Sequence, residues 1–145
     1  MIDATPYQGP ILVTGAYILL YYLFQIRINR VKSRLRREYA GRGEKFDRYF
    51  GQDRFMLAAD RTQLNMLEHM PPFLLLMWLH AVFVSPLSAS VAGGVYLVAR
   101  IGHPILMGSR LGRGIRLAVL IATVPGYLVI VYLLAGVAGA AFGLL

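Results

Sequence analysis

The chain has 145 residues, of which 57% are hydrophobic, and its formal net charge is +8. This apolar fraction exceeds what a soluble domain of this size carries, and the length leaves room for one domain, residues 1–145. The chain contains no cysteine, which excludes disulfides, a protein thiolate nucleophile and a thiolate metal site.

Four apolar stretches are each long enough to cross a bilayer, which takes roughly 20 mostly apolar residues. They cover residues 7–26, 66–84, 87–109 and 117–145. The predicted fold class is therefore all-α, an integral membrane bundle of four helices. No positive charge precedes the first stretch, so we interpret it as a retained helix and not as a secretory signal.

The 15 Lys and Arg residues all fall within residues 27–61 and 100–116. Cytoplasmic loops collect Lys and Arg, so loops 27–61 and 108–116 are predicted to be cytoplasmic and both termini to lie on the opposite side. Positive charge beside membrane spans favours lipid headgroups or acidic small molecules as partners, and we expect no nucleic-acid partner. A bacterial inner membrane and the endoplasmic reticulum both stay open.

The first helix is predicted to continue beyond the membrane, because residues 27–37 contain good helix formers and neither Gly nor Pro. Gly41 and Gly43 are expected to end it. Residues 44–51 mix charged and aromatic side chains, and we interpret them as an ordered loop at the membrane interface. A flexible, solvated linker is the alternative.

The second helix is expected to begin near Arg54 or Phe55, well before its apolar part. It forms an antiparallel hairpin with the third helix, because only the short link 85–88 separates them. The fourth helix is expected to begin at about Gly114.

Three polar residues, Arg61, Asn65 and Glu68, share one face of the second helix at positions i, i+4 and i+7. The third helix adds Arg100 and His103, and the antiparallel arrangement places both groups at the cytoplasmic end. One interpretation is an ion pair between Glu68 and an arginine that only fixes helix packing. The other is a pocket open to the cytoplasm, rich in guanidinium groups, with one carboxylate and one amide.

Such a pocket suits a ligand that carries carboxylates, an ammonium group and an amide. Glutathione has all of these groups, and a nearby arginine could hold its thiol as a thiolate. His69, His80 and His103 do not have a metal-ligand spacing, so no metal site is predicted. His80 is interpreted as a residue of the membrane interface, and His69 as a packing residue beside Glu68.

Residues 61–71 have the sequence RTQLNMLEHMP, and residues 95–103 have the sequence VYLVARIGH. These stretches resemble the second-helix and third-helix signatures of the MAPEG family, the membrane-associated proteins of eicosanoid and glutathione metabolism. Residues 33–37 are similar to the basic tail of the first helix in one branch, microsomal prostaglandin E synthase. The microsomal glutathione transferases are another similar branch.

The resemblance implies a homotrimer of four-helix subunits, with glutathione bound between adjacent subunits near the cytoplasmic face. The thiol-activating arginine of the family corresponds to Arg116 or, if the loop differs in length, to Arg113. The candidate glutathione-binding residues are Arg34, Arg61, Asn65, Glu68, Arg100 and His103.

Met107 replaces a glutathione-contacting tyrosine of several members, and Leu117 replaces a serine of prostaglandin E synthase. These differences argue against that isomerase activity. The implied function is a glutathione transferase or peroxidase that acts on a lipophilic electrophile or hydroperoxide from the bilayer. A non-catalytic lipid-binding scaffold resembling the five-lipoxygenase-activating protein, and a small transport or channel subunit, are the alternatives.

Overall fold

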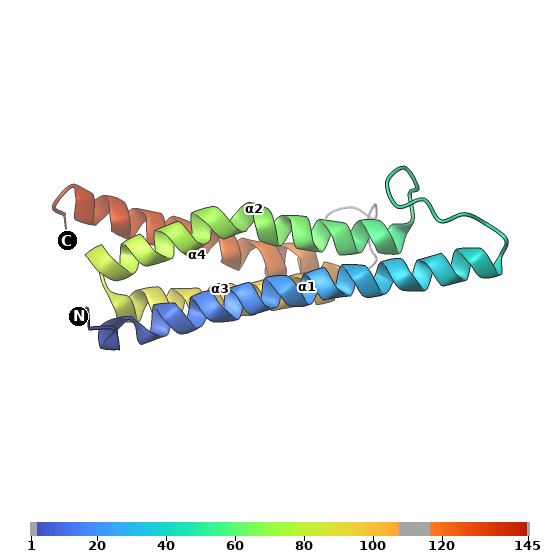
Figure 1. Cartoon of the computed structure of the whole chain (residues 1–145). Coiled ribbons are helices and arrows are strands. Elements are labelled where there is room, and N and C mark those ends of the chain that lie inside the picture. Colours follow the sequence, from blue (N-terminus) through green and yellow to red (C-terminus); the bar gives the residue numbers. More distant parts are fainter. Residues whose placement is uncertain (1–2, 108–116, 145) are drawn as a thin grey trace.

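The computed structural model describes residues 3–107 and 117–144 of the chain. Its helices run side by side in alternating directions, and both termini lie at the same end of the bundle (Figure 1). The all-α bundle predicted from the sequence is confirmed. The helices of the described ranges are η1 (Thr5–Tyr7), α1 (Gln8–Gly41), α2 (Arg54–Phe83), α3 (Pro86–Met107) and α4 (Leu117–Ala141).

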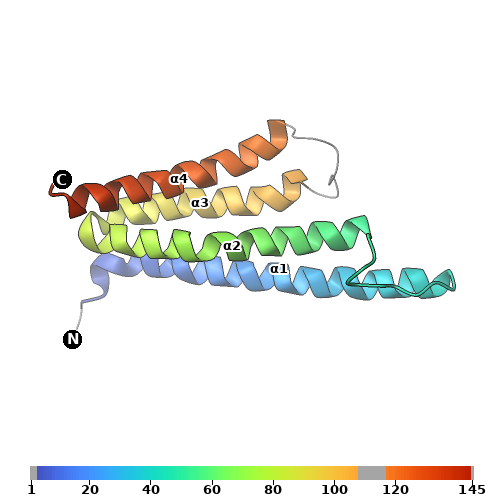
Figure 2. The ribbon, with the colours of Figure 1, turned by 90° about the horizontal axis from the view of Figure 1, so that it is seen from above.

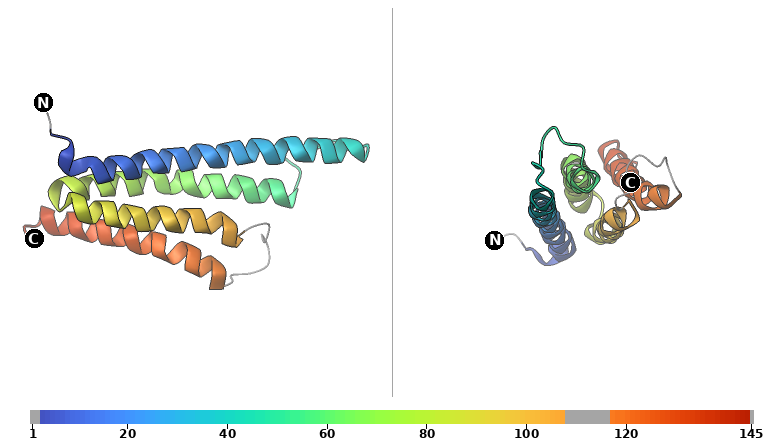
Figure 3. Two further views of the ribbon diagram at one scale, coloured as in Figure 1. Left: turned by 90° about the horizontal axis from the view of Figure 1, so that it is seen from below. Right: turned by 90° about the vertical axis from the view of Figure 1, so that its right-hand side faces the viewer.

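Helices α2 and α3 hold the bundle together, because each packs against all three other long helices. Viewed end-on in Figure 3, α1 and α4 lie on opposite sides of them. Asn65 of α2 and Arg100 of α3 meet between these helices, and Gly126 of α4 lies against the guanidinium of Arg100.

Three segments of the described chain are long and apolar enough to cross a membrane: Thr5–Gly41, Arg54–Phe83 and Thr123–Ala141. They expose large apolar side chains such as Leu12, Leu75 and Leu128. Exposed apolar surface on this scale indicates a lipid environment. Helix α3, which carries Arg100 and His103, is not among these segments, so the fourth predicted span stays a prediction.

Helix α1 is the longest helix and projects beyond the rest of the bundle at the end opposite the termini (Figure 2). It has 34 residues, which corresponds to a length of about 51 Å. It ends at Gly41, and Gly43 follows with a φ of 72°, a conformation that favours glycine. The predicted extension and its glycine stop are confirmed.

The loop between α1 and α2 is packed against both helices. Arg48 pairs with Asp60 at 3.2 Å and lies 3.4 Å from the Met56 sulfur. The Phe46 and Tyr39 rings meet edge to face, with their centroids 5.4 Å apart. The loop is therefore ordered, and its position at a membrane interface stays a prediction.

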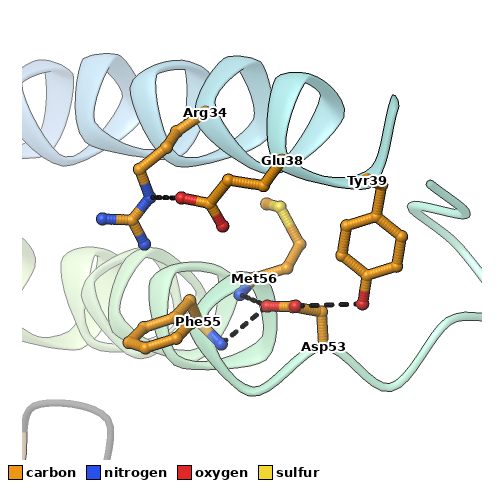
Figure 4. Close-up of polar contacts among 6 residues, drawn as sticks. All are labelled: Arg34, Glu38, Tyr39, Asp53, Phe55 and Met56. Carbon is orange, nitrogen blue, oxygen red and sulfur yellow. Dashed lines mark hydrogen bonds and ion pairs between the residues drawn. The ribbon is translucent and has the colours of Figure 1, made fainter. Parts of the chain in front are cut away.

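Asp53 starts helix α2 as its N-cap. Its carboxylate accepts hydrogen bonds from the Phe55 and Met56 amides at 2.9 and 3.1 Å, and from the Tyr39 hydroxyl at 3.2 Å (Figure 4). A capping carboxylate satisfies amides that have no partner within the helix. The predicted start of α2 near Arg54 is confirmed.

Three aromatic rings form the centre of the bundle. Phe73 and Tyr96 stack with centroids 3.8 Å apart, and Tyr17 lies 5.4 Å from Phe73. The Tyr17 hydroxyl donates to the Met66 carbonyl at 2.7 Å, one turn before the Pro71 and Pro72 pair. Close packing and interhelical hydrogen bonds of this kind hold helices together in lipid, where the hydrophobic effect between helices is absent.

His80 is only 1% exposed, so the interpretation as a residue of the membrane interface is wrong. Its Nε2 lies 2.9 Å from the Ser88 hydroxyl, and its Nδ1 lies 3.4 Å from the Leu133 carbonyl oxygen. A Cβ at Gly136 would lie 2.4 Å from the His80 ring, so only glycine lets α4 approach this closely. His80 is a polar link between α2, α3 and α4 near the termini.

Candidate functional site

A buried arginine is the centre of the candidate site. Arg100 of α3 is 3% exposed, and its Nη1 donates to the Asn65 side-chain oxygen on α2. Its Nη2 lies 3.3 Å from the Nδ1 of His69, also on α2, and its guanidinium lies 4.8 Å from the centre of the Tyr96 ring. Because a guanidinium only donates hydrogen bonds, Nδ1 of His69 is the acceptor.

Helix α4 completes this cluster with a glycine and a tyrosine. A Cβ at Gly126 would lie 2.9 Å from the Arg100 Nη2, so the glycine leaves the space that the guanidinium occupies. The Tyr127 ring meets the His69 ring edge to face, with their centroids 5.1 Å apart. The cluster therefore joins α2, α3 and α4.

The buried guanidinium has no carboxylate partner among the described residues. Its Nε has no hydrogen-bond partner in this part of the chain, and neither does the neighbouring Tyr96 hydroxyl. An arginine inside a bundle is costly unless an opposite charge or a full set of acceptors compensates it. The arrangement thus retains capacity for an anionic group.

Arg61 and Glu68 flank Asn65 on α2, and both side chains are exposed. Glu68 forms no ion pair within residues 3–107 and 117–144, and Arg100 bonds to Asn65 and His69 instead. Arg100 is therefore not the partner in the ion pair between Glu68 and an arginine that one interpretation proposed. A pair with an arginine of residues 108–116 lies outside the described residues.

Arg34 has no interaction with this cluster among the described residues. Its Nε lies 3.3 Å from the Glu38 carboxylate, and its guanidinium lies 5.1 Å from the centre of the Phe55 ring (Figure 4). Glu38 lies on α1 itself and Phe55 lies at the start of α2. Half of the Arg34 side chain is exposed. Arg34 is thus available to a neighbouring molecule.

His103 is buried on α3, three residues after Arg100. The two candidate catalytic residues, Arg113 and Arg116, lie outside the described residues. The side chain of Met107, which replaces the family tyrosine, also lies outside them. Their roles stay predictions.

His69 is the contact that the sequence analysis missed. The packing role assigned to it is incomplete, because its ring accepts a hydrogen bond from Arg100. The spacing of His69 from Asn65 could have predicted this contact. Residues four apart share a helix face, so an arginine that reaches Asn65 can also reach His69. Gly126 carries no such signal, because its role depends on how α4 is rotated.

A sequence model of the MAPEG family matches residues 10–139, which include α2, α3 and nearly all of α1 and α4. The chain belongs to the MAPEG family. Membership in this family supports a role for this membrane protein in glutathione or eicosanoid metabolism. The family contains glutathione transferases and synthases and also non-enzymatic members. Comparison with curated proteins found no significant match.

The family match includes the whole cluster of this MAPEG protein, from Asn65 on α2 to Tyr127 on α4. The residues that make the cluster polar therefore lie within the family domain itself and not in an added segment.

Proposed function

We propose that this MAPEG protein is a membrane enzyme that binds glutathione and delivers its thiolate to a lipophilic electrophile or hydroperoxide. One observation carries the proposal: the guanidinium of Arg100 is buried without a carboxylate partner in the described chain, beside an amide and an imidazole. A bound carboxylate would supply the missing negative charge.

Each polar group at the site has a counterpart in glutathione. Arg61 and Arg100 suit the two carboxylates, and the exposed Glu68 suits the ammonium group. Asn65 gives its oxygen to Arg100, so its amide nitrogen remains for a carbonyl of the tripeptide. His103 lies at the same end of α3 and would add a further contact.

The exposed polar face of α2 supports a site that is completed by a second copy of the chain. Arg61 and Glu68 are exposed, and within the described residues the charged group of Arg34 interacts with Glu38 of α1 and Phe55 at the start of α2. In the homotrimer that we propose, Arg34 of a neighbouring subunit would reach glutathione at this face.

Thiol activation would come from Arg116, or from Arg113 as the alternative. A guanidinium near the sulfur lowers the free energy of the thiolate, and the anchored carboxylates orient it toward the substrate. In conjugation the sulfur forms a bond to the electrophilic carbon and the leaving group departs. In hydroperoxide reduction two glutathione molecules become the disulfide, and the products are an alcohol and water.

We also propose the orientation that the charge distribution predicts. Residues 27–61 and 100–116 carry all the Lys and Arg residues, and the termini lie at the other end of the bundle (Figure 1). The positive-inside rule then places the site on the cytoplasmic side. The membrane is a bacterial inner membrane or the endoplasmic reticulum.

Calorimetric titration of the detergent-purified protein with glutathione tests the binding step. We expect saturable binding that weakens roughly tenfold or more in Arg61→Ala, because a charged hydrogen bond contributes about 1.5–3 kcal/mol. Arg42→Ala is the matched control, since Arg42 pairs with Glu44 in the loop after α1. Wild-type protein that binds no glutathione would replace this proposal with the non-catalytic lipid-binding scaffold.

A further inference from the structure

A groove runs along the outer side of α3 and α4. Two adjoining hollows, with volumes of about 600 and 560 Å³, share the lining residues Val91, Val95 and Pro125 and therefore form one continuous groove. It extends along α3 from Ser85 to Gly102, about 25 Å at the helical rise.

Small residues keep this groove open. A Cβ at Gly94 or Gly102 would meet no atom within 4 Å, whereas a Cβ at neighbouring Gly93 would lie 2.7 Å from Val13 in the core. Val98 and Leu128 form exposed walls, at 71% and 63% exposure. The groove is thus a shallow, open depression in the surface and not a gap in the core.

The groove lies on an exposed, apolar part of the bundle, with Val91, Val98 and Leu128 among its exposed side chains, and such a surface suits contact with lipid. Its length exceeds the roughly 15 Å that one leaflet contributes to the hydrocarbon core. A single extended acyl chain therefore fits along it.

The end of the groove near the termini is polar but carries no charge. Ser85 and Ser88 line it, and the Ser88 hydroxyl lies 2.9 Å from Nε2 of His80. The Ser88 hydroxyl also lies 3.2 Å from the Ser85 carbonyl oxygen, so its one proton serves either that carbonyl or Nε2 of His80, and the imidazole takes the matching tautomer. The Ser88 oxygen keeps a lone pair for a donor from the groove.

The polarity of this end selects among head groups. Among the residues that the structure describes, the lining of the groove includes no Lys, Arg, Asp or Glu. A phosphate or carboxylate head group would lose water without gaining a cation, which costs free energy. A hydroxyl could instead donate to the Ser88 oxygen and accept from Ser85.

We propose that the groove binds a lipid with one acyl chain and an uncharged, hydroxyl-bearing head group of the monoacylglycerol class. The head group lies at Ser85 and Ser88, and the chain follows α3 past Val91 and Val95 toward Gly102. This site is separate from the Arg100 cluster, and the proposal does not rest on glutathione binding.

Photolabelling in phosphatidylcholine nanodiscs tests the site. A monoacylglycerol with a diazirine in its chain is added at low mole fraction, and the labelled peptides are mapped by mass spectrometry. We expect label on the peptide that contains Val91 and Val95, reduced roughly tenfold or more when Gly94→Phe fills the groove. Gly15→Phe is the matched control, because its Cβ also meets open space, on α1 away from the groove.

Competition on the wild-type protein tests the head group without any substitution. Unlabelled monoacylglycerol should displace the probe several-fold better than the methyl ester or the free fatty acid of the same chain length. Label spread evenly over α1 and α3, and unchanged in Gly94→Phe, would overturn the proposal in favour of bulk lipid. Equal displacement by all three competitors, or cross-linking of the groove to a second copy of the chain, would also overturn it.

Discussion

The guanidinium of Arg100 occupies the space that a side chain at position 126 would fill. A Cβ on Gly126 would lie 2.9 Å from the Arg100 Nη2, although the two residues belong to different helices. A glycine of α4 and an arginine of α3 thus depend on each other, and this dependence can be tested.

Gly126→Ala should displace the Arg100 guanidinium and weaken its bonds to Asn65 and His69. We expect a lower melting temperature and weaker glutathione binding. Gly15→Ala should leave the melting temperature unchanged or raise it. A Cβ at Gly15 meets no atom within 4 Å, and replacing such a helical glycine by alanine raises the free energy of unfolding by up to about 1 kcal/mol. Equal behaviour of the two variants in thermal unfolding and titration would mean that Gly126 is not required.

Arg100→Met separates a binding role from a packing role. Arg100→Met removes a buried charge that lacks a carboxylate partner in the described chain, which favours the folded state, but it leaves the Asn65 and His69 acceptors without their donor, which opposes it. We therefore expect the melting temperature to stay close to that of the wild type while glutathione binding is lost. If Arg100 served packing alone, Arg100→Met would lower the melting temperature and leave binding intact.

Ser88→Ala removes the hydroxyl that lies 2.9 Å from the buried Nε2 of His80. Leaving a buried polar group without a hydrogen-bond partner costs about 1–3 kcal/mol, so thermal unfolding should begin at a lower temperature. Ser90→Ala is the control, because its hydroxyl donates only to the Pro86 carbonyl within the same helix. A Ser88→Ala variant as stable as Ser90→Ala would contradict the link between α2, α3 and α4.

Asp47 gives the loop after α1 a dependence on pH. Its carboxylate accepts hydrogen bonds from the amides of Phe50 and Tyr49, which lower the pKa of Asp47 below its ordinary value of 3.8. A carboxyl whose folded pKa is depressed stabilises the turn above its unfolded pKa and loses this contribution as the pH falls through the folded pKa. Carboxyl-carbon NMR should show a midpoint below 3.8, and a midpoint at or above that value would contradict the turn.

The sequence predicts the parts of the fold that local chemistry determines. The glycines that end α1, the start of α2 near Arg54 and the shared face of Arg61, Asn65 and Glu68 all depend on residues close together in the chain. These features follow from helix propensity and from the periodicity of the helix.

The contacts between helices could not be predicted in the same way. His80 was assigned to the membrane interface because its position in the chain does not reveal which helices surround it. The bond from Arg100 to His69 and the space left by Gly126 depend on the rotation of α3 and α4 about their axes. Only the packed bundle supplies that information.

Ultraviolet difference absorption on adding glutathione to the purified protein tests the central claim most directly, because it reports thiolate formation. We expect a saturable thiolate signal near neutral pH in the wild type, which Arg116→Ala abolishes if Arg116 activates the thiol. The signal should also be lost in Arg100→Met, which lacks the buried guanidinium that anchors glutathione. A wild type without any signal, and without glutathione binding by calorimetry, would contradict the assignment as a glutathione-dependent enzyme.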